Sequence, residues 1–455
     1  MSSTHERYTL GIDIGTTKVA VALVDGGTRE VIATASLAHE SDVTGVATGR
    51  SEQKVEQILA TLDRCIDRLP HDAYENVESI GVTGQMHGVV LWNEKTREVS
   101  HLVTWQDQRC LEGDFLSHLR ATTGDPSAQS GYGTATLAWL AHHDSSRLSR
   151  YTAAATIHDY VVSRLTGNAR PITDPSDAAS FGLYDLHTRR WREDALSSAG
   201  IPLYLLPEIR NAGERVGALT ESFANRWGIR AGVPVGNALG DNQASIFGSL
   251  TDPKSQIALT IGTGAQLSVV VPSLPSEISI RCAGYEYRPY VGESFIAVVA
   301  SLAGGRALAA FGKALEGFIR ELGVSPTPSL DRIQTVMHQQ GLARFDTDLV
   351  ASPSLAGERY DTSLRGSINQ LSFENFTVGD MIAALCRGLV TSLRDALPKE
   401  LLASRREVVG SGNAIARSPL IRRVIEESFG CALTLQDSAE TTACGAALVA
   451  AVKAD

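Results

Sequence analysis

One short pattern occurs twice in this chain: an apolar strand that runs into a Gly-Thr turn. It reads IDIGTT at residues 12–17 and LTIGTG at residues 259–264, so corresponding positions lie 247 residues apart. Because this offset is about half of the 455-residue chain, the pattern predicts two halves that are diverged copies of one another. A match of six residues by itself fits coincidence as well as duplication. If duplication holds, we expect two α/β lobes that face each other across a cleft.

Composition and charge argue against several classes of protein. At roughly 100–200 residues per domain, the length indicates two to four domains. The 51 acidic and 41 basic residues give a net charge of −10, and no Lys/Arg block marks a nucleic-acid binder. No apolar run approaches the ~18 residues of a membrane span. The first residues, MSSTHERY, lack the apolar core of a secretory signal. We therefore expect a cytoplasmic protein with neither nucleic acid nor membrane as a partner.

The cysteines are scattered, with no C-x-x-C pair and no histidine at metal-ligand spacing. That distribution argues against a zinc site and against a disulfide framework. We expect buried thiols at Cys65, Cys110, Cys282, Cys386, Cys431 and Cys444.

Strand and helix patterns alternate along the chain. Apolar residues at 8–15 and 19–25 flank the turn Thr16-Thr17-Lys18, which predicts a β-hairpin. Apolar residues three and four apart predict a helix over residues 52–69, with Ser51 as its N-cap. Further helices are predicted at residues 134–142, 156–165, 305–322 and 378–397, and between Ser418-Pro419 and Gly430. The chain is therefore predicted to be mixed α/β.

The two Gly-Thr turns offer phosphate chemistry. In the first, Asp13 emerges from a strand, Gly15 lets the backbone approach a ligand, and two threonines add hydroxyl groups. Such a turn can hold phosphate oxygens, while the carboxylate holds a bridging cation. The second turn, Gly262-Thr263-Gly264, repeats the arrangement. The alternative is that both are ordinary hairpin turns.

Three later segments complete the set. Asp241 follows Gly240 at the end of an apolar strand and begins a helix, which suits a proton acceptor in phosphoryl transfer and equally suits a helix cap. Residues 410–413 (GSGN) offer bare backbone for a flat ring, or form a plain strand-to-helix turn. Small residues at 438–451 predict a helix that another group approaches closely, which a packed core helix explains equally well.

The order GIDIGTT, GDNQ, IGTG, GSGNA and a small-residue helix resembles the FGGY carbohydrate kinases of the actin-like sugar-kinase superfamily, along essentially the whole chain. Within the family, HLVTWQDQRC and IHDYVV are most similar to the sedoheptulokinase branch. Further matching segments are GVTGQMHGVVLW (81–92), HLVTWQDQRC (101–110), TIHDYVVSRLTG (156–167), TDPSDAAS (173–180), LAGGRALAAF (302–311) and SPSLAGER (352–359).

This resemblance implies two actin-like (ribonuclease H-like) lobes with a cleft between them. Residues 1–247 would form the N-terminal lobe, with the sugar site and first phosphate turn. Residues 248–455 would form the C-terminal lobe, with the second phosphate turn and the adenosine site.

The implied reaction is ATP-dependent phosphorylation of a ketose on its terminal primary hydroxyl, namely sedoheptulose to sedoheptulose 7-phosphate. Xylulokinase stays open, because it shares the M-H-G turn and the W-x-D-x-R pattern. An actin-like ATPase that changes shape for a protein partner is the alternative of another class, although TWQDQRC would have no purpose there.

The resemblance also assigns residues, with ketose and ATP as partners and a homodimer left open. Asp241 would be the general base and, with Asp13, a Mg²⁺ ligand. ATP would be held by Asp13, Gly15, Thr16, Thr17, Lys18, Gly262, Thr263, Gly264, Gly410, Ser411, Gly412 and Asn413. The sugar would contact Gln85, Met86, His87, Trp105, Asp107, Arg109, Asp159, Asp241 and Asn242.

Several of these assignments have an alternative in which the residue has a purely structural role. Trp105 would also fit a core position, Asp107 with Arg109 a surface pair, and Asp159 the exposed face of its helix. Lys18 departs from the serine common in the family, so its ammonium either reaches phosphate or points to solvent. Other departures are Gly410-Ser411-Gly412 for G-G-G and Arg387-Gly388 for Glu-Gly.

Overall fold

The structure is a computed structural model that describes residues 7–275, 281–282, 284–358, 361, 363–436 and 440–454. The side chain of Cys282 and all of Arg359 lie outside the described residues. The chain forms two compact units. Unit 1 comprises Met1–Ser249, Pro289–Glu293 and Ser438–Asp455, and unit 2 comprises Leu250–Arg288 and Ser294–Asp437.

Unit 1 contains a seven-stranded sheet of order β13-β14-β5-β1-β2-β3, with β15 beside β5. The strands of unit 1, inside and outside this sheet, are β1 (Tyr8–Ile14), β2 (Lys18–Asp25), β3 (Val31–Ala38), β4 (Glu52–Gln53), β5 (Val77–Gly84), β6 (Val90–Trp92), β7 (Leu102–Val103), β8 (Ala153–Ala155), β9 (Ile172–Thr173), β10 (Tyr184–Asp185), β11 (Arg190–Trp191), β12 (Glu208–Ile209), β13 (Arg215–Ala218), β14 (Pro234–Gly236) and β15 (Leu239–Gly240). Its helices are α1 (Val55–Ile66), α2 (Phe115–Thr123), α3 (Gly133–His143), α4 (Ser145–Leu148), α5 (Ile157–Thr166), α6 (Pro175–Phe181), α7 (Glu193–Ser198), α8 (Glu221–Trp227), α9 (Asp241–Ser249) and α16 (Thr441–Ala454).

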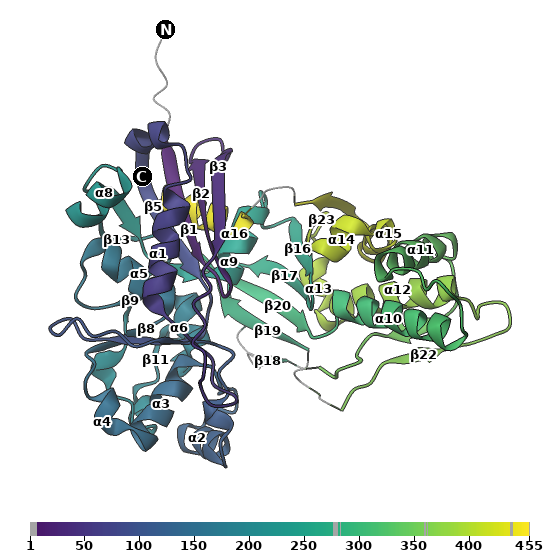
Figure 1. Cartoon of the computed structure of the whole chain (residues 1–455), viewed down its shortest axis with the longest axis horizontal. Helices are drawn as coiled ribbons and strands as arrows, with labels where there is room; N and C mark the ends of the chain where they lie inside the picture. Colours follow the sequence, from purple (N-terminus) through teal and green to yellow (C-terminus); the bar gives the residue numbers. More distant parts are fainter. Residues whose placement is uncertain are drawn as a thin grey trace, which may run out of the picture. The chain divides into compact units, whose positions relative to one another are not determined.

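Side chains of β2 alternate between the two faces of this sheet and pack against a different helix on each face. Successive side chains of a strand point to opposite faces. One set packs with α1, which contacts β2 and β3, and the other packs with α16; both helices are labelled in Figure 1. The first set is Val19, Val21 and Leu23 with Ile58 and Leu62; the second is Ala22 and Val24 with Ala443 and Ala447. Buried apolar surface therefore holds a helix on each face.

Helix α16 approaches its neighbours through glycines. A Cβ added at Gly11 or Gly81 would lie 1.9 or 2.0 Å from carbonyl oxygens of α16, and one at Gly445 would lie 1.8 Å from Ala244 O on α9. Contacts this close exclude any side chain, so the small residues serve a packed core helix. Helix α16 groups with unit 1, whereas the expected division places it with residues 248–455. The functional division into lobes stays a prediction.

Unit 2 repeats the sheet topology of unit 1. Its strands are β16 (Gln256–Ile261), β17 (Ala265–Val271), β18 (Arg281–Cys282), β19 (Tyr285–Pro289), β20 (Phe295–Ser301), β21 (Val350–Ser352), β22 (Ser367–Asn369), β23 (Glu407–Ser411) and β24 (Ala432–Leu435). Its helices are α10 (Gly305–Glu321), α11 (Leu330–Ala343), α12 (Val378–Ala396), α13 (Lys399–Leu402), α14 (Asn413–Arg417) and α15 (Pro419–Phe429). In β20-β17-β16-β23-β24, as in β3-β2-β1-β5-β14, three antiparallel strands are followed by two parallel ones. The two Gly-Thr turns therefore occupy equivalent places in the two sheets.

Most predicted elements are present, with three local differences. Helix α1 begins at Val55 with Lys54 as its N-cap, because strand β4 (Glu52–Gln53) separates the predicted cap Ser51 from the helix. Helix α11 was not anticipated, since it buries only Ile333, Met337 and Gly341, a narrow stripe. Four cysteines are buried thiols as expected, whereas Cys431 is only half-buried. No helix within the described ranges combines the length and apolar character needed to cross a bilayer.

Candidate active site

The first Gly-Thr turn joins β1 to β2 and is held through its carbonyl groups. His39 Nε2 lies 3.2 Å and Gln85 Nε2 3.4 Å from Gly15 O, and Gln53 Nε2 donates to Thr16 O at 2.8 Å. Backbone carbonyls tied down in this way fix the orientation of the intervening peptide groups. Gln85 was predicted as a site residue. His39 and Gln53 were missed, because neither belongs to a motif.

Two carboxylates come together at this end of the sheet. Burial raises the pKa of Asp13 to about 8, and the negative charge of Asp241 adds to the rise. Asp13 Oδ1 is buried and has no hydrogen-bond partner among the described residues. A buried carboxylate next to a second one is stabilised by a divalent cation, so these residues fit the predicted Mg²⁺.

Lys18 forms an ion pair with Glu440, and its role toward ATP stays a prediction. Its Nζ donates to both carboxylate oxygens of Glu440, at 2.7 and 2.6 Å. Both side chains act on the nearby carboxyl, because Lys18 lowers and Glu440 raises the pKa of Asp13. Glu440 precedes α16 and was not predicted as a site residue.

Asp241 is the first residue of α9 and directly follows β15. Leu239 and Gly240 pair in parallel with Thr83 and Gly84 of β5, so the carboxylate emerges where these strands end. Its Oδ1 accepts the N–H of Asn242 at 2.7 Å. The position agrees with the role predicted for Asp241, which stays a prediction, as does that of Asn242.

The M-H-G segment forms a tight turn. Gly88 N donates to Met86 O at 3.0 Å around His87, whose φ is +75°. A three-residue turn with positive φ is strained for a non-glycine residue, and such strain gathers at functional sites. The His87 ring stacks on Tyr132 at 4.7 Å between centroids, and its Nδ1 lies 2.7 Å from Ser180 O.

Trp105 is not a core residue. Its side chain is 42% exposed, and its Nε1 donates to Thr16 Oγ1 at 3.1 Å. The indole is thus partly exposed to solvent beside the first Gly-Thr turn. An indole of this kind is suited to pack on the C–H groups of a sugar.

Asp107 and Arg109 form a buried pair and not a surface pair. Asp107 Oδ1 accepts from N and Nε of Arg109, and Oδ2 accepts from Arg109 Nη2 and Ser51 N, at 2.8–3.0 Å. Arg109 Nη2 also donates to Glu52 Oε1 at 2.8 Å. Each carboxylate oxygen of Asp107 therefore already accepts two hydrogen bonds. Its sugar contact stays a prediction.

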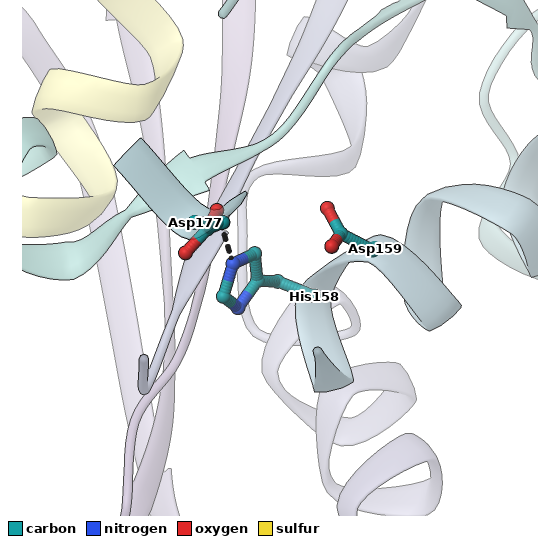
Figure 2. A group of neighbouring side chains, drawn as sticks. All are labelled: His158, Asp159 and Asp177. Carbon is teal, nitrogen blue, oxygen red and sulfur yellow. Dashed lines mark hydrogen bonds and ion pairs between the residues drawn. The ribbon is translucent and has the colours of Figure 1, made fainter. Parts of the chain in front are cut away.

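A fully buried polar cluster lies between α5 and α6 (Figure 2). His158 Nε2 and Asp177 Oδ2 are 2.7 Å apart, and Asp159 lies beside them. Asp159 is therefore buried and not on an exposed helix face. Burial raises the pKa of Asp159 to about 7, raises that of Asp177 and lowers that of His158. Two atoms that bind one tetrahedral metal ion lie about 3.4 Å apart. The 2.7 Å between His158 Nε2 and Asp177 Oδ2 is shorter, so this contact fits a hydrogen bond better than a shared metal ion.

In unit 2 the second Gly-Thr turn lies beside the GSGN turn. Gly410 and Ser411 pair with Leu259 and Thr260, and a Cβ on Gly412 would lie 2.5 Å from Ile261 O. Gly412 has a φ of +94° and precedes Asn413, the first residue of α14. Gly305 N, at the start of α10, donates to Gly262 O at 2.8 Å. The predicted residues Gly262, Thr263 and Gly264 thus adjoin the predicted adenosine turn.

Comparisons with known proteins agree with this arrangement. The model of the FGGY family of carbohydrate kinases, N-terminal domain, matches residues 8–248. The chain is 35% identical to the sedoheptulokinase of Homo sapiens over 97% of this chain and 96% of that protein. It is 25% identical to the xylulose kinase of Staphylococcus xylosus, over 98% of this chain and 90% of that one.

Solved structures show the same fold. The xylulose kinase from Rhodospirillum rubrum has a TM-score of 0.82 at 23% identity, covering 99% of this chain and 91% of that one. The xylulose kinase from Brucella ovis has a TM-score of 0.79 at 23% identity, covering 98% and 90%. Two sheets of one topology, each with a Gly-Thr turn at the same place, accord with the two-lobe actin-like fold. Together with the match over residues 8–248 and the full-length similarity, they show that the chain belongs to the FGGY family of carbohydrate kinases.

Proposed function

We propose that this chain transfers the γ-phosphoryl group of ATP to the terminal primary hydroxyl of a ketose, converting sedoheptulose to sedoheptulose 7-phosphate. The observation that carries the chemistry is the proximity of Asp241, at the end of β15, to Asp13, at the end of β1. The identity to human sedoheptulokinase over nearly the whole chain supports the choice of sugar. The proposal includes a cytoplasmic enzyme with ATP and ketose as its partners.

In this account the Asp241 carboxylate accepts the proton of the sugar hydroxyl as its oxygen attacks the γ-phosphorus. The bond from the γ-phosphorus to the bridging oxygen breaks, and ADP leaves. Asp13 and Asp241 would hold Mg²⁺, which neutralises phosphate charge when bound. Gln85, Met86, His87 and Trp105 would orient the sugar. The turns at residues 15–17 and 262–264 would hold phosphates, and residues 410–413 would hold the adenosine.

A sugar panel tests the proposal. ADP release with Mg-ATP is measured against sedoheptulose, xylulose, ribulose, fructose and glycerol, and the product is examined by NMR. We expect the highest kcat/KM with sedoheptulose and phosphate on its terminal carbon. Preference for xylulose would replace the sugar while keeping the reaction, as the similarity to the xylulose kinase of Staphylococcus xylosus allows. ATP turnover that no sugar stimulates would overturn the proposal in favour of an actin-like ATPase.

A further inference from the structure

A buried hydrogen-bonded link ends at the N–H of Gly240, the residue directly before Asp241. Gly240 N donates to Ser176 Oγ at 3.1 Å, and Ser176 Oγ donates to Asp174 Oδ1 at 2.7 Å. The same Asp174 Oδ1 accepts the N–H of Asp177 at 2.9 Å, which caps α6. Asp174 and Ser176 are each only 1% exposed. The Leu239–Gly240 peptide, one residue before the proposed base, is thus held by a side chain that is almost fully buried.

The other end of this link is fixed as well. Helix α6 has only seven residues, too few for a helix to be stable alone. The buried hydrogen bond between His158 and Asp177 ties α6 to α5 (Figure 2). A Cβ on Gly240 would lie 2.4 Å from Met86 Cε, so the Met86 side chain packs directly against this glycine. Ser176 therefore fixes the N–H of Gly240, and Met86 packs against the same residue.

We propose that Ser176, oriented by Asp174, is a positioning residue that fixes the Gly240 peptide and thereby the direction in which Asp241 projects. The inference rests on the proposed function, in which Asp241 is the general base. Without the hydroxyl, the buried N–H of Gly240 loses its acceptor, which is unfavourable, and the strand end shifts to find another. A shift of about 1 Å in a catalytic group lowers the rate by about 100-fold. The sugar and ATP are also held by residues that do not move with Gly240, so KM changes less than kcat.

Ser176→Ala in the full chain is compared with wild type by steady-state kinetics, with Mg-ATP and the best sugar, and by thermal unfolding. We expect kcat to fall about tenfold to 100-fold while both KM values change by a smaller factor than kcat. Asp174→Asn keeps the acceptor oxygen and should retain most of kcat, whereas Asp174→Ala should lose it as Ser176→Ala does. Ser176→Cys keeps the shape with only a weak acceptor, so it should lower kcat in the same direction if alanine fails to fold.

Ser79→Ala is the matched control. Ser79 lies near the start of β5, and its buried Oγ bonds Thr9 Oγ1 at 3.0 Å, so its loss removes a comparable bond in the same sheet. We expect it to lower the thermal midpoint and leave kcat unchanged. An unchanged kcat in folded Ser176→Ala, or an equal fall in Ser79→Ala, overturns the positioning role alone. A wild-type chain without sugar-stimulated turnover overturns the proposed function as well.

Discussion

At the scale of single residues, the charges around Asp13 are the most informative feature. Burial and Asp241 raise its pKa to about 8, Lys18 opposes the rise and Glu440 adds to it. Lys18 and Glu440 form an ion pair with each other. Replacing either residue removes a charge whose effect on the pKa of Asp13 has a known sign. The carboxylate form is the one that holds a cation. The acid limb of the pH profile of kcat/KM for Mg-ATP should therefore follow the ionisation of the Asp13 carboxyl.

Two charge variants should move that limb in opposite directions. Lys18→Gln removes a charge that lowers the pKa of Asp13, so kcat/KM for Mg-ATP should reach half its plateau at a higher pH. Glu440→Gln removes a charge that raises it, so the midpoint should move to a lower pH. Lys95→Gln, at an exposed loop position, is the control and should not move it. Shifts of the same sign in the two variants would contradict the assignment.

The sequence predicts those site residues that carry a local signal. Asp13, Asp241 and the two Gly-Thr turns stand at strand ends within short motifs, so pattern alone locates them. His39 and Gln53 lie outside every motif, and the segments that contain Ser176 and Glu440 assign no role to either residue. Each of the four acts on residues distant in the chain. Their roles depend on tertiary contacts that no spacing rule encodes. The structural alternatives for Trp105 (a core position), Asp107 (a surface pair) and Asp159 (an exposed helix face) are wrong for the same reason, because burial is set by the whole fold.

At the scale of elements, the close approach of α16 to its neighbours carries the most weight. Gly445→Ala would place a methyl 1.8 Å from Ala244 O, a backbone atom that moves only with α9. We expect a loss of about 1–3 kcal/mol in the free energy of unfolding, typical of overpacking. Urea unfolding followed by circular dichroism measures it.

The control for that change is Gly317→Ala in α10. A Cβ at Gly317 meets no heavy atom within 4 Å. Alanine in a helix interior is favoured over glycine by roughly 0.5–1 kcal/mol, so this variant should be more stable than wild type. If Gly445→Ala were equally harmless, the close packing of α16 on α9 would be wrong.

At the scale of the whole molecule, the repeated IGT pattern predicts the two similar sheets correctly but not which unit the last helix joins. Both sheets follow from strands that carry their own periodicity. The small residues of α16 fit any close-packed place, so nothing local assigns it to unit 1. The division of the chain between two functional lobes stays a prediction.

A truncated chain tests the place of α16. Ending the chain at residue 437 would expose the face of β1, β2 and β5 that α16 covers. We expect limited proteolysis to cut within residues 7–249 of the truncated chain, while unit 2, which keeps its own core, resists. Equal resistance of residues 7–249 in both chains would show that α16 is dispensable there.

The measurement that tests the account most directly is sugar-dependent ADP release by Asp241→Asn beside wild type. The amide keeps the shape of the side chain but cannot take up the proton of the sugar hydroxyl. We expect kcat to fall by about 10²–10⁴-fold, the usual contribution of a general base, with an unchanged thermal midpoint. A folded Asp241→Asn protein that retains wild-type kcat would contradict the assignment of Asp241 as the base.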